Sequence, residues 1–80
     1  MTRYFFDLTD DAGEMSDALG TERKSFDQMR AQARRILCDI ASEEASNALD
    51  ELEFSMRVRD GADLAVYEIS LSIVGRRLPR

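Results

Sequence analysis

The stretch ELEFSMRVRDGADLAVYEISLSIV, residues 51–74, decides the fold because two alternating apolar patterns flank a turn sequence. The apolar residues are Leu52, Phe54, Met56 and Val58 before the turn, and Ala65, Tyr67, Ile69, Leu71 and Ile73 after it. A period of two is typical of strands that bury one face. Asp60-Gly61 is a strong hairpin signal. We predict an antiparallel hairpin with a loop of two or four residues, and either loop places both apolar sets on one face.

A third strand is predicted at the start of the chain, over residues 3–9. Tyr4, Phe6 and Leu8 share one face there, so we assign Tyr4 and Phe6 to the core and Phe5 to the opposite face. The connection that follows, residues 10–24, is long for a small domain. We expect it to retrace the length of the sheet, with Met15 and Leu19 as apolar anchors.

A helix is predicted to begin after Ser25, because Ser25 and Gln28 have the spacing of a capping box. One helical face then collects Phe26, Met29, Ala33, Ile36, Leu37 and Ile40. Continued regularly, this face would press Glu44 and Asn47 against the core. We therefore place the end of the helix between Ala41 and Asp50, and favour an end near Leu49.

These elements predict an α+β fold with the order β-α-β-β. A right-handed crossover would make the first two strands parallel, and the most apolar strand would then lie between them. The expected architecture is a three-stranded antiparallel sheet of order 1-3-2, with the helix packed on one face. We expect residues 1–74 to form a single domain and residues 75–80 to form a mobile basic tail.

Composition narrows the function more by exclusion than by assignment. The chain has 80 residues, a net charge of −5, one cysteine and no histidine. It therefore lacks the residues of a cysteine-cluster zinc site and the commonest general base. The acidic loop also fails the spacing of a calcium-binding EF-hand. We expect no metal, no cofactor, no small-molecule substrate, no membrane span and no enzymatic activity, and a cytoplasmic location.

Two surfaces are predicted to be spare. The outer face of the sheet carries the candidate partner contacts Phe5, Arg57, Val66 and Glu68, and no second helix is predicted to cover them. The helix carries the candidate helix–helix contacts Ala31, Cys38 and Ala45. We therefore predict a small protein-interaction or self-associating module, most simply a homodimer.

A second prediction is a nucleic-acid-associated regulator resembling antitoxin-type small domains, by analogy of fold alone. The helix has a basic first half, with Arg30, Arg34 and Arg35. However, the acidic net charge disfavours binding to phosphates, and a pair such as Asp27–Arg30 explains the charges equally well. We do not expect nucleic-acid binding.

Three short motifs carry a resemblance to a known family. They are RYFFD at residues 3–7, DALGTE at residues 17–22 and VRDG at residues 58–61, together with the Ser25 cap. In these the chain resembles a family of short bacterial proteins of unknown function that open with an RYFF(D/H) strand. It departs from the family at Lys24-Ser25, where proline and aspartate are frequent, and in a shorter hairpin turn. The resemblance implies a bacterial cytosolic protein with a β-α-β-β fold, and it transfers no functional residue.

Overall fold

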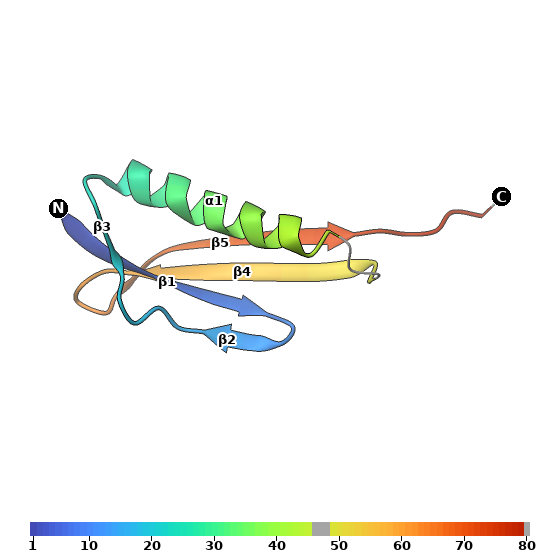
Figure 1. The fold of residues 1–80 in the computed structure, drawn as a ribbon, viewed down its shortest axis with the longest axis horizontal. Coiled ribbons are helices and arrows are strands. Elements are labelled where there is room, and N and C mark those ends of the chain that lie inside the picture. The colour runs from blue at the N-terminus through green and yellow to red at the C-terminus, as the bar shows by residue number, and fades with distance from the viewer. Residues whose placement is uncertain (46–48, 80) are drawn as a thin grey trace.

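The structure, a computed structural model, describes residues 1–45 and 49–79. Its elements are β1 (Thr2–Asp10), β2 (Gly13–Met15), β3 (Thr21–Arg23), α1 (Phe26–Glu43), β4 (Glu51–Arg59) and β5 (Ala65–Val74). The helix covers one face of an antiparallel sheet, which confirms the predicted α+β class (Figure 1).

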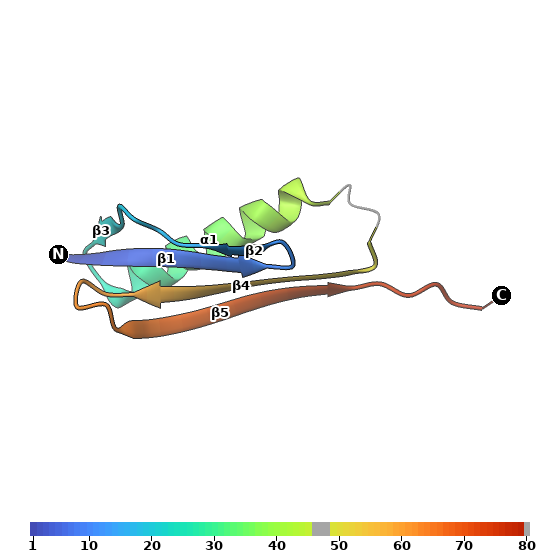
Figure 2. The same ribbon diagram turned by 90° about the horizontal axis from the view of Figure 1, so that it is seen from below.

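The sheet has five strands, not three, and the predicted strand order is wrong. The order is β2-β1-β4-β5, and β3 pairs with the same strand as β2, namely β1. Phe6 lies opposite Val58 in the β1–β4 pair, and Met56 lies opposite Ile69 in the β4–β5 pair. The first strand of the hairpin, β4, therefore lies inside the sheet between β1 and β5, and β5 lies at the edge (Figure 2).

The path between β1 and α1 explains this error. The chain turns after β1 and returns along it, first as β2 and then as β3, which confirms the predicted retracing. Consequently α1 begins near the amino-terminal end of β1, and the chain enters β4 from the opposite end (Figure 1). Because the chain has already run back along β1 before the helix begins, β4 is antiparallel to β1 and the two strands pair directly. The expected anchors, Met15 and Leu19, are both exposed.

The β4–β5 hairpin has a longer loop than either predicted length. Arg59 lies opposite Ala65, and a register shift follows at once, so that Val58 lies opposite Tyr67. The Asp60 N–H donates to the Leu64 carbonyl over 2.9 Å, and Asp63 adopts a φ of 63°. The bulge restores the pairing parity, which is why the two apolar sets still share the face under the helix.

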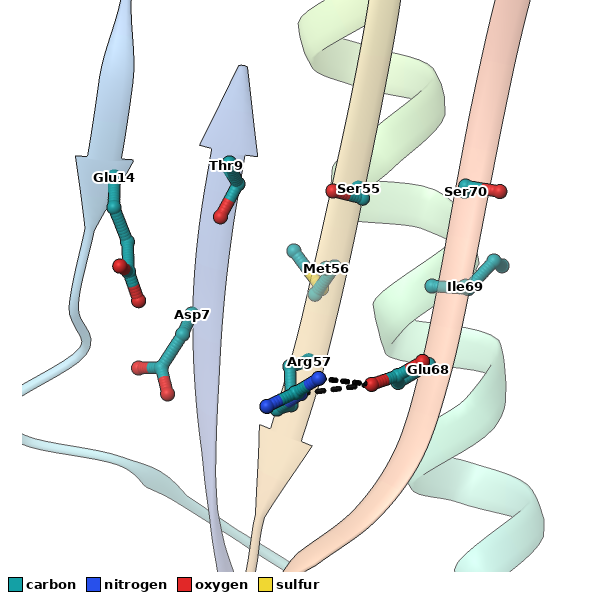
Figure 3. A pocket seen from close by; sticks show the side chains of 9 residues that line it. All are labelled: Asp7, Thr9, Glu14, Ser55, Met56, Arg57, Glu68, Ile69 and Ser70. Atoms are coloured by element: carbon teal, nitrogen blue, oxygen red, sulfur yellow. Dashed lines mark hydrogen bonds and ion pairs between the residues drawn. The ribbon is translucent and has the colours of Figure 1, made fainter.

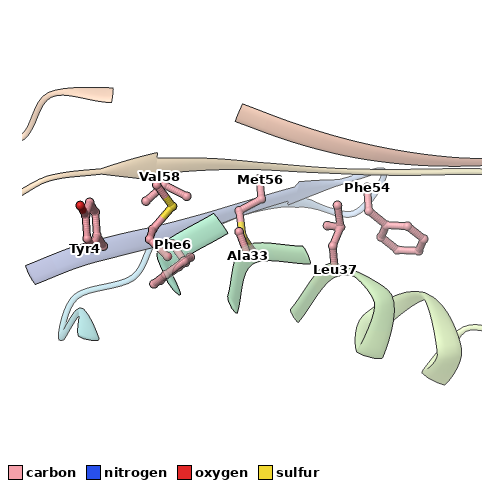
Figure 4. Close-up of a cluster of buried hydrophobic side chains, with 8 residues drawn as sticks. Tyr4, Phe6, Ala33, Leu37, Phe54, Met56 and Val58 are labelled. Atoms are coloured by element: carbon pink, nitrogen blue, oxygen red, sulfur yellow. The ribbon is translucent and has the colours of Figure 1, made fainter. Parts of the chain in front are cut away.

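The core lies between β1, β4 and α1. Its buried side chains are Tyr4, Phe6, Met29, Ala33, Leu37, Phe54, Met56 and Val58 (Figure 4). The apolar residues of β5 contribute less, because Tyr67, Ile69 and Leu71 are only half-buried. Phe26, expected on the buried helix face, is exposed and meets Tyr67 edge-on, with 5.8 Å between ring centroids. The edge strand is thus the least covered of the long strands.

The helix begins as predicted and ends earlier. The Ser25 side chain accepts a hydrogen bond from the Gln28 N–H over 3.1 Å, the expected amino-terminal cap. The helix ends at Glu43, not near Leu49; the residues directly after Ala41 are Ser42, Glu43 and Glu44, which supply no apolar side chain to the core face. Ala45 lies beyond α1, and the part of the favoured helix over residues 46–48 lies outside the described residues.

The chain after β5 has no regular secondary structure over residues 75–79. Arg80, the last residue of the predicted tail, lies outside the described residues.

Candidate functional site

The outer face of the sheet, opposite α1, carries a shallow polar groove. Its volume is about 530 Å³, and it crosses β2, β1, β4 and β5 (Figure 3). The lining residues are Asp7, Thr9, Glu14, Ser55, Met56, Arg57, Glu68, Ile69 and Ser70. Alternation along the strands explains the polarity, since the odd residues of β1 and β4 face away from the helix.

Two of the four predicted contact residues pair with each other across this groove. Arg57 and Glu68 lie opposite one another in the β4–β5 register, and the Arg57 Nε donates to Glu68 Oε1 over 2.8 Å. Figure 3 shows the two side chains reaching toward each other over the sheet. Their side chains remain 62% and 64% exposed, so water screens much of the attraction.

A second arginine on the same face, Arg59, makes a far more enclosed contact with Asp7. The Arg59 Nε donates to Asp7 Oδ2 over 2.5 Å, and its Nη2 donates to Asp7 Oδ1 over 3.0 Å. Arg59 also donates to the Asp17 carbonyl and to the Asp63 carboxylate. Asp7 is the only buried charged residue in the described part of the chain. Such a two-pronged pair fixes geometry as well as charge.

Asp17 completes this cluster by acting in place of a strand. The β1 edge is paired by β3 up to Tyr4 and by β2 from Leu8 onward, which leaves the Phe6 N–H between them. Asp17 Oδ2 accepts a hydrogen bond from that N–H over 3.1 Å, and the Asp17 N–H donates to Asp7 Oδ1 over 2.9 Å. The Asp17 side chain therefore supplies the hydrogen-bond acceptor that a neighbouring strand would otherwise give to the Phe6 N–H.

The pKa values in the cluster follow from these contacts. The hydrogen bond from Arg59 holds the pKa of Asp7 below its ordinary value despite burial. Burial pushes the pKa of Asp17 upward, but the N–H groups of Gly20, Phe6 and Leu19 outweigh it and leave that pKa lowered. The two carboxylates of Asp7 and Asp63 raise the pKa of Arg59. We call Asp7, Asp17 and Arg59 the ionic cluster. Its hydrogen bonds link β1, β4 and the segment between β2 and β3, and they favour the charged form of each side chain.

Phe5 lies on the outer face of the sheet, away from the core, where it packs beside the ionic cluster; its role as a partner contact stays a prediction. Its side chain is half-buried, and the Arg59 guanidinium lies 5.0 Å from its ring centroid. Gly20 covers it closely: a Cβ at Gly20 would lie 2.9 Å from Phe5 Cε1. The cation that stacks on Phe5 is Arg59 of the same chain, because Arg59 lies opposite Phe5 in the β1–β4 pair.

The other predicted contact residues remain on the surface. Val66 is exposed beside the hairpin loop, at the start of β5. Ala31 and Cys38 are exposed on α1, and Cys38 is a free thiol. Ala45 is also exposed but follows the helix, so the three do not form one helical stripe.

Arg30, in the basic half of α1, has partners within the chain. Arg30 lies 3.5 Å from Asp27, which confirms the predicted pair, and its guanidinium lies 5.9 Å from the Tyr67 ring centroid. Arg23 donates to Gln32 across the start of the helix. Within residues 1–45 and 49–79, no group of three or more Cys, Asp or Glu side chains is arranged to hold a metal ion.

Asp7, Asp17 and Arg59 were not predicted to form a unit, although each lies in one of the three short motifs. RYFFD supplies Phe5 and Asp7, DALGTE supplies Asp17 and Gly20, and VRDG supplies Arg59. The structure brings all three motifs to one end of the outer face. That the three motifs lie together could have indicated the cluster, but this follows only once β1 and β4 are known to be adjacent.

These features define a small α+β domain whose sheet is cross-linked by side-chain hydrogen bonds at the β1 side and has a free strand edge at β5. The family described as "Domain of unknown function (DUF6894)" matches residues 3–72, and the chain belongs to it. The predicted membership of a family of unknown function is thus confirmed, whereas the bacterial origin and the RYFF(D/H) opening as a family motif stay predictions. No curated protein and no solved structure matches the chain. None of the described helices is long and apolar enough to cross a membrane.

Proposed function

We propose that this protein is a small non-enzymatic interaction module that self-associates through the free edge of β5. One observation supports this most directly. The strand has ten residues, Ala65–Val74, and it pairs with β4 on one side, while no strand among the described residues pairs with its other side. A free edge of that length presents a row of unpaired backbone N–H and carbonyl groups.

The sequence of β5 does little to discourage pairing. Proteins commonly protect an edge with proline, with several charges, or with a short strand. The strand AVYEISLSIV contains no proline and one charged residue, Glu68. Its bulge lies at the start, beside the hairpin loop, so the rest of the edge is regular. Val66, Ile73 and Val74 are exposed there.

The opposite edge of the sheet is a poorer docking site. It is formed by β2 and β3, which have three residues each, and the Asp17 side chain occupies the break between them. Neither segment can support a long ladder of backbone hydrogen bonds. The two edges therefore differ in what they offer a partner, and β5 offers more.

Sedimentation velocity from the low to the high micromolar range tests the proposal. We expect the wild-type protein to associate reversibly, and Ser70→Lys, which adds a charge to the exposed side of β5, to weaken association several-fold. Thr9→Lys is the matched control, because Thr9 is exposed on the same face but on β1. Equal weakening by both variants would contradict the edge.

A protein that stays monomeric at every concentration would also overturn the proposal. If such a monomer bound DNA or RNA with a steep salt dependence, the nucleic-acid alternative would replace it.

A further inference from the structure

We infer that the β5 edge pairs with β5 of a second copy, antiparallel, around a twofold axis that passes beside Ser70. The inference rests on the proposed self-association and adds the partner and its register. Two identical edges can pair antiparallel only when the axis stands perpendicular to the sheet. Both helices then lie on one side of a continuous sheet, and only residues of the same face can lie opposite each other.

The Ser70 register matches like with like on both faces. On the outer face, Ser70 lies opposite Ser70 of the second copy, and Val74 lies beside Val66, the residue at the bulge. On the helix side, Tyr67 lies opposite Ile73, and Ile69 lies opposite Leu71. Glu68 meets Ser72, so it keeps its own Arg57 partner and meets no second carboxylate. Apolar and β-branched pairs of this kind stabilise antiparallel sheets.

The neighbouring registers fit less well. An axis at Glu68 would oppose the two glutamates, which is destabilising. An axis at Ile69 would place Val66 against Ser72, and an axis at Leu71 would place Val74 against Glu68. An axis at Ser72 would leave about half of the ten-residue strand unpaired, and an axis at Val66 would leave more than half unpaired. Charge and apolar matching therefore single out the Ser70 register among the even alternatives.

The same register covers the apolar groups that β5 leaves exposed. Val66 and Val74 cover each other twice by symmetry, and Ile73 reaches Tyr67, whose ring already contacts Phe26. A single ladder of this length falls at the small end of specific interfaces, well below about 1,600 Å². We therefore expect a weak dimer that dissociates on dilution.

Cross-linking by a single cysteine tests the register. In a Cys38→Ala background, Ser70→Cys should link two chains through a short bis-thiol reagent, because directly opposed residues lie about 5 Å apart. Ser72→Cys is the matched control on the same face. Two such cysteines would be offset by four residues, or about 13 Å, and should link several-fold less.

A mixture of Glu68→Cys and Ser72→Cys chains provides a second, independent measurement. In the Ser70 register these two cysteines lie directly opposite, so the mixture should link far more than either chain alone. Linking of Ser72→Cys alone that equals or exceeds Ser70→Cys would overturn the register.

The outcomes separate this inference from the proposed function. If sedimentation shows an association that Ser70→Lys weakens, but neither Ser70→Cys nor the mixture links, self-association stands and the twofold register is wrong. If the protein is monomeric at every concentration, both are wrong.

Discussion

Arg57 and Arg59 lie two residues apart on the same face of β4, yet they stand in different surroundings. In the pair of Arg59 with Asp7, the side chains are 26% and 10% exposed, whereas in the pair of Arg57 with Glu68 they are 62% and 64% exposed. The difference comes from the segment between β2 and β3, which brings Asp17 against the first pair and Gly20 against the neighbouring Phe5 ring. Nothing in the described part of the chain covers the second pair in this way.

The two sides of the sheet thus differ in how many of their groups have partners within the chain. Around β1, backbone groups, charges and the Phe5 ring all have partners within the chain. Around β5, the ion pair is screened by water and the strand edge is free. We therefore expect changes near Asp7 to act on folding and changes on β5 to act on association.

The largest effect is expected from acid, because it removes both carboxylate charges of the ionic cluster. The folded-state pKa values of Asp7 and Asp17 are lowered from 3.8, so the unfolded chain takes up protons first as the pH falls. Their contribution to stability is complete above about pH 5 and is lost as the pH falls through 3.8 and below. Urea unfolding at a series of pH values measures it. A free energy of unfolding that rises as the pH falls through this range would contradict the assignment.

Asp7→Asn should be the most damaging conservative substitution on the outer face. The amide group would turn a donor toward Arg59 or toward the Asp17 N–H, in place of an acceptor. We expect a loss of about 2–3 kcal/mol in the free energy of unfolding. Urea unfolding at neutral pH measures it, and the variant should also show a shallower acid dependence. A loss of stability no larger than that of Glu68→Gln would show that the ionic cluster does not stabilise the fold more than the exposed pair does.

Gly20→Ala should cost about 1–3 kcal/mol, because Gly20 has a φ of +71° that side chains disfavour. The added Cβ would also lie 3.0 Å from the Tyr4 carbonyl oxygen, which is backbone and cannot move aside cheaply. Gly61→Ala is the matched control, since no atom lies within 4 Å of its added Cβ. Thermal unfolding of the two variants compares them; equal melting temperatures would mean that the segment does not press on Phe5.

The smallest effect is expected for the open pair. A double-mutant cycle of Arg57→Ala and Glu68→Ala should give a coupling energy of about 0.2–1 kcal/mol, typical of exposed ion pairs. Raising the salt concentration should reduce it further. A coupling energy as large as the loss in Asp7→Asn would remove the distinction between the two sides of the sheet.

The hairpin, the helix cap and the helix core face could be predicted from the sequence because each rests on local periodicity. Ser25 and Gln28 are three residues apart, and the face of Met29, Ala33 and Leu37 follows helical spacing. Even the wrong loop length left the strand faces right, because the bulge at Val58/Arg59 restored the parity.

The strand order and the ionic cluster could not be predicted, because both depend on where the segment after β1 lies. Between the short strands β2 and β3, its return path is held by Asp17, which bonds to the Phe6 N–H, the Asp7 carboxylate and the Arg59 guanidinium. No period in the sequence marks these contacts. Likewise Arg57 and Arg59 are equivalent in an alternating pattern, and only the covering segment tells them apart.

Native-state hydrogen exchange, measured residue by residue at several protein concentrations, distinguishes the closed side of the sheet at β1 from the open edge at β5. We expect the Phe6 and Gly20 amides, both bound to Asp17, to be protected at every concentration. We expect the β5 amides that point away from β4 to exchange quickly in dilute protein and to slow markedly as the concentration rises. Exchange of those β5 amides at one unchanging rate, fast or slow, over the whole range would contradict this expectation.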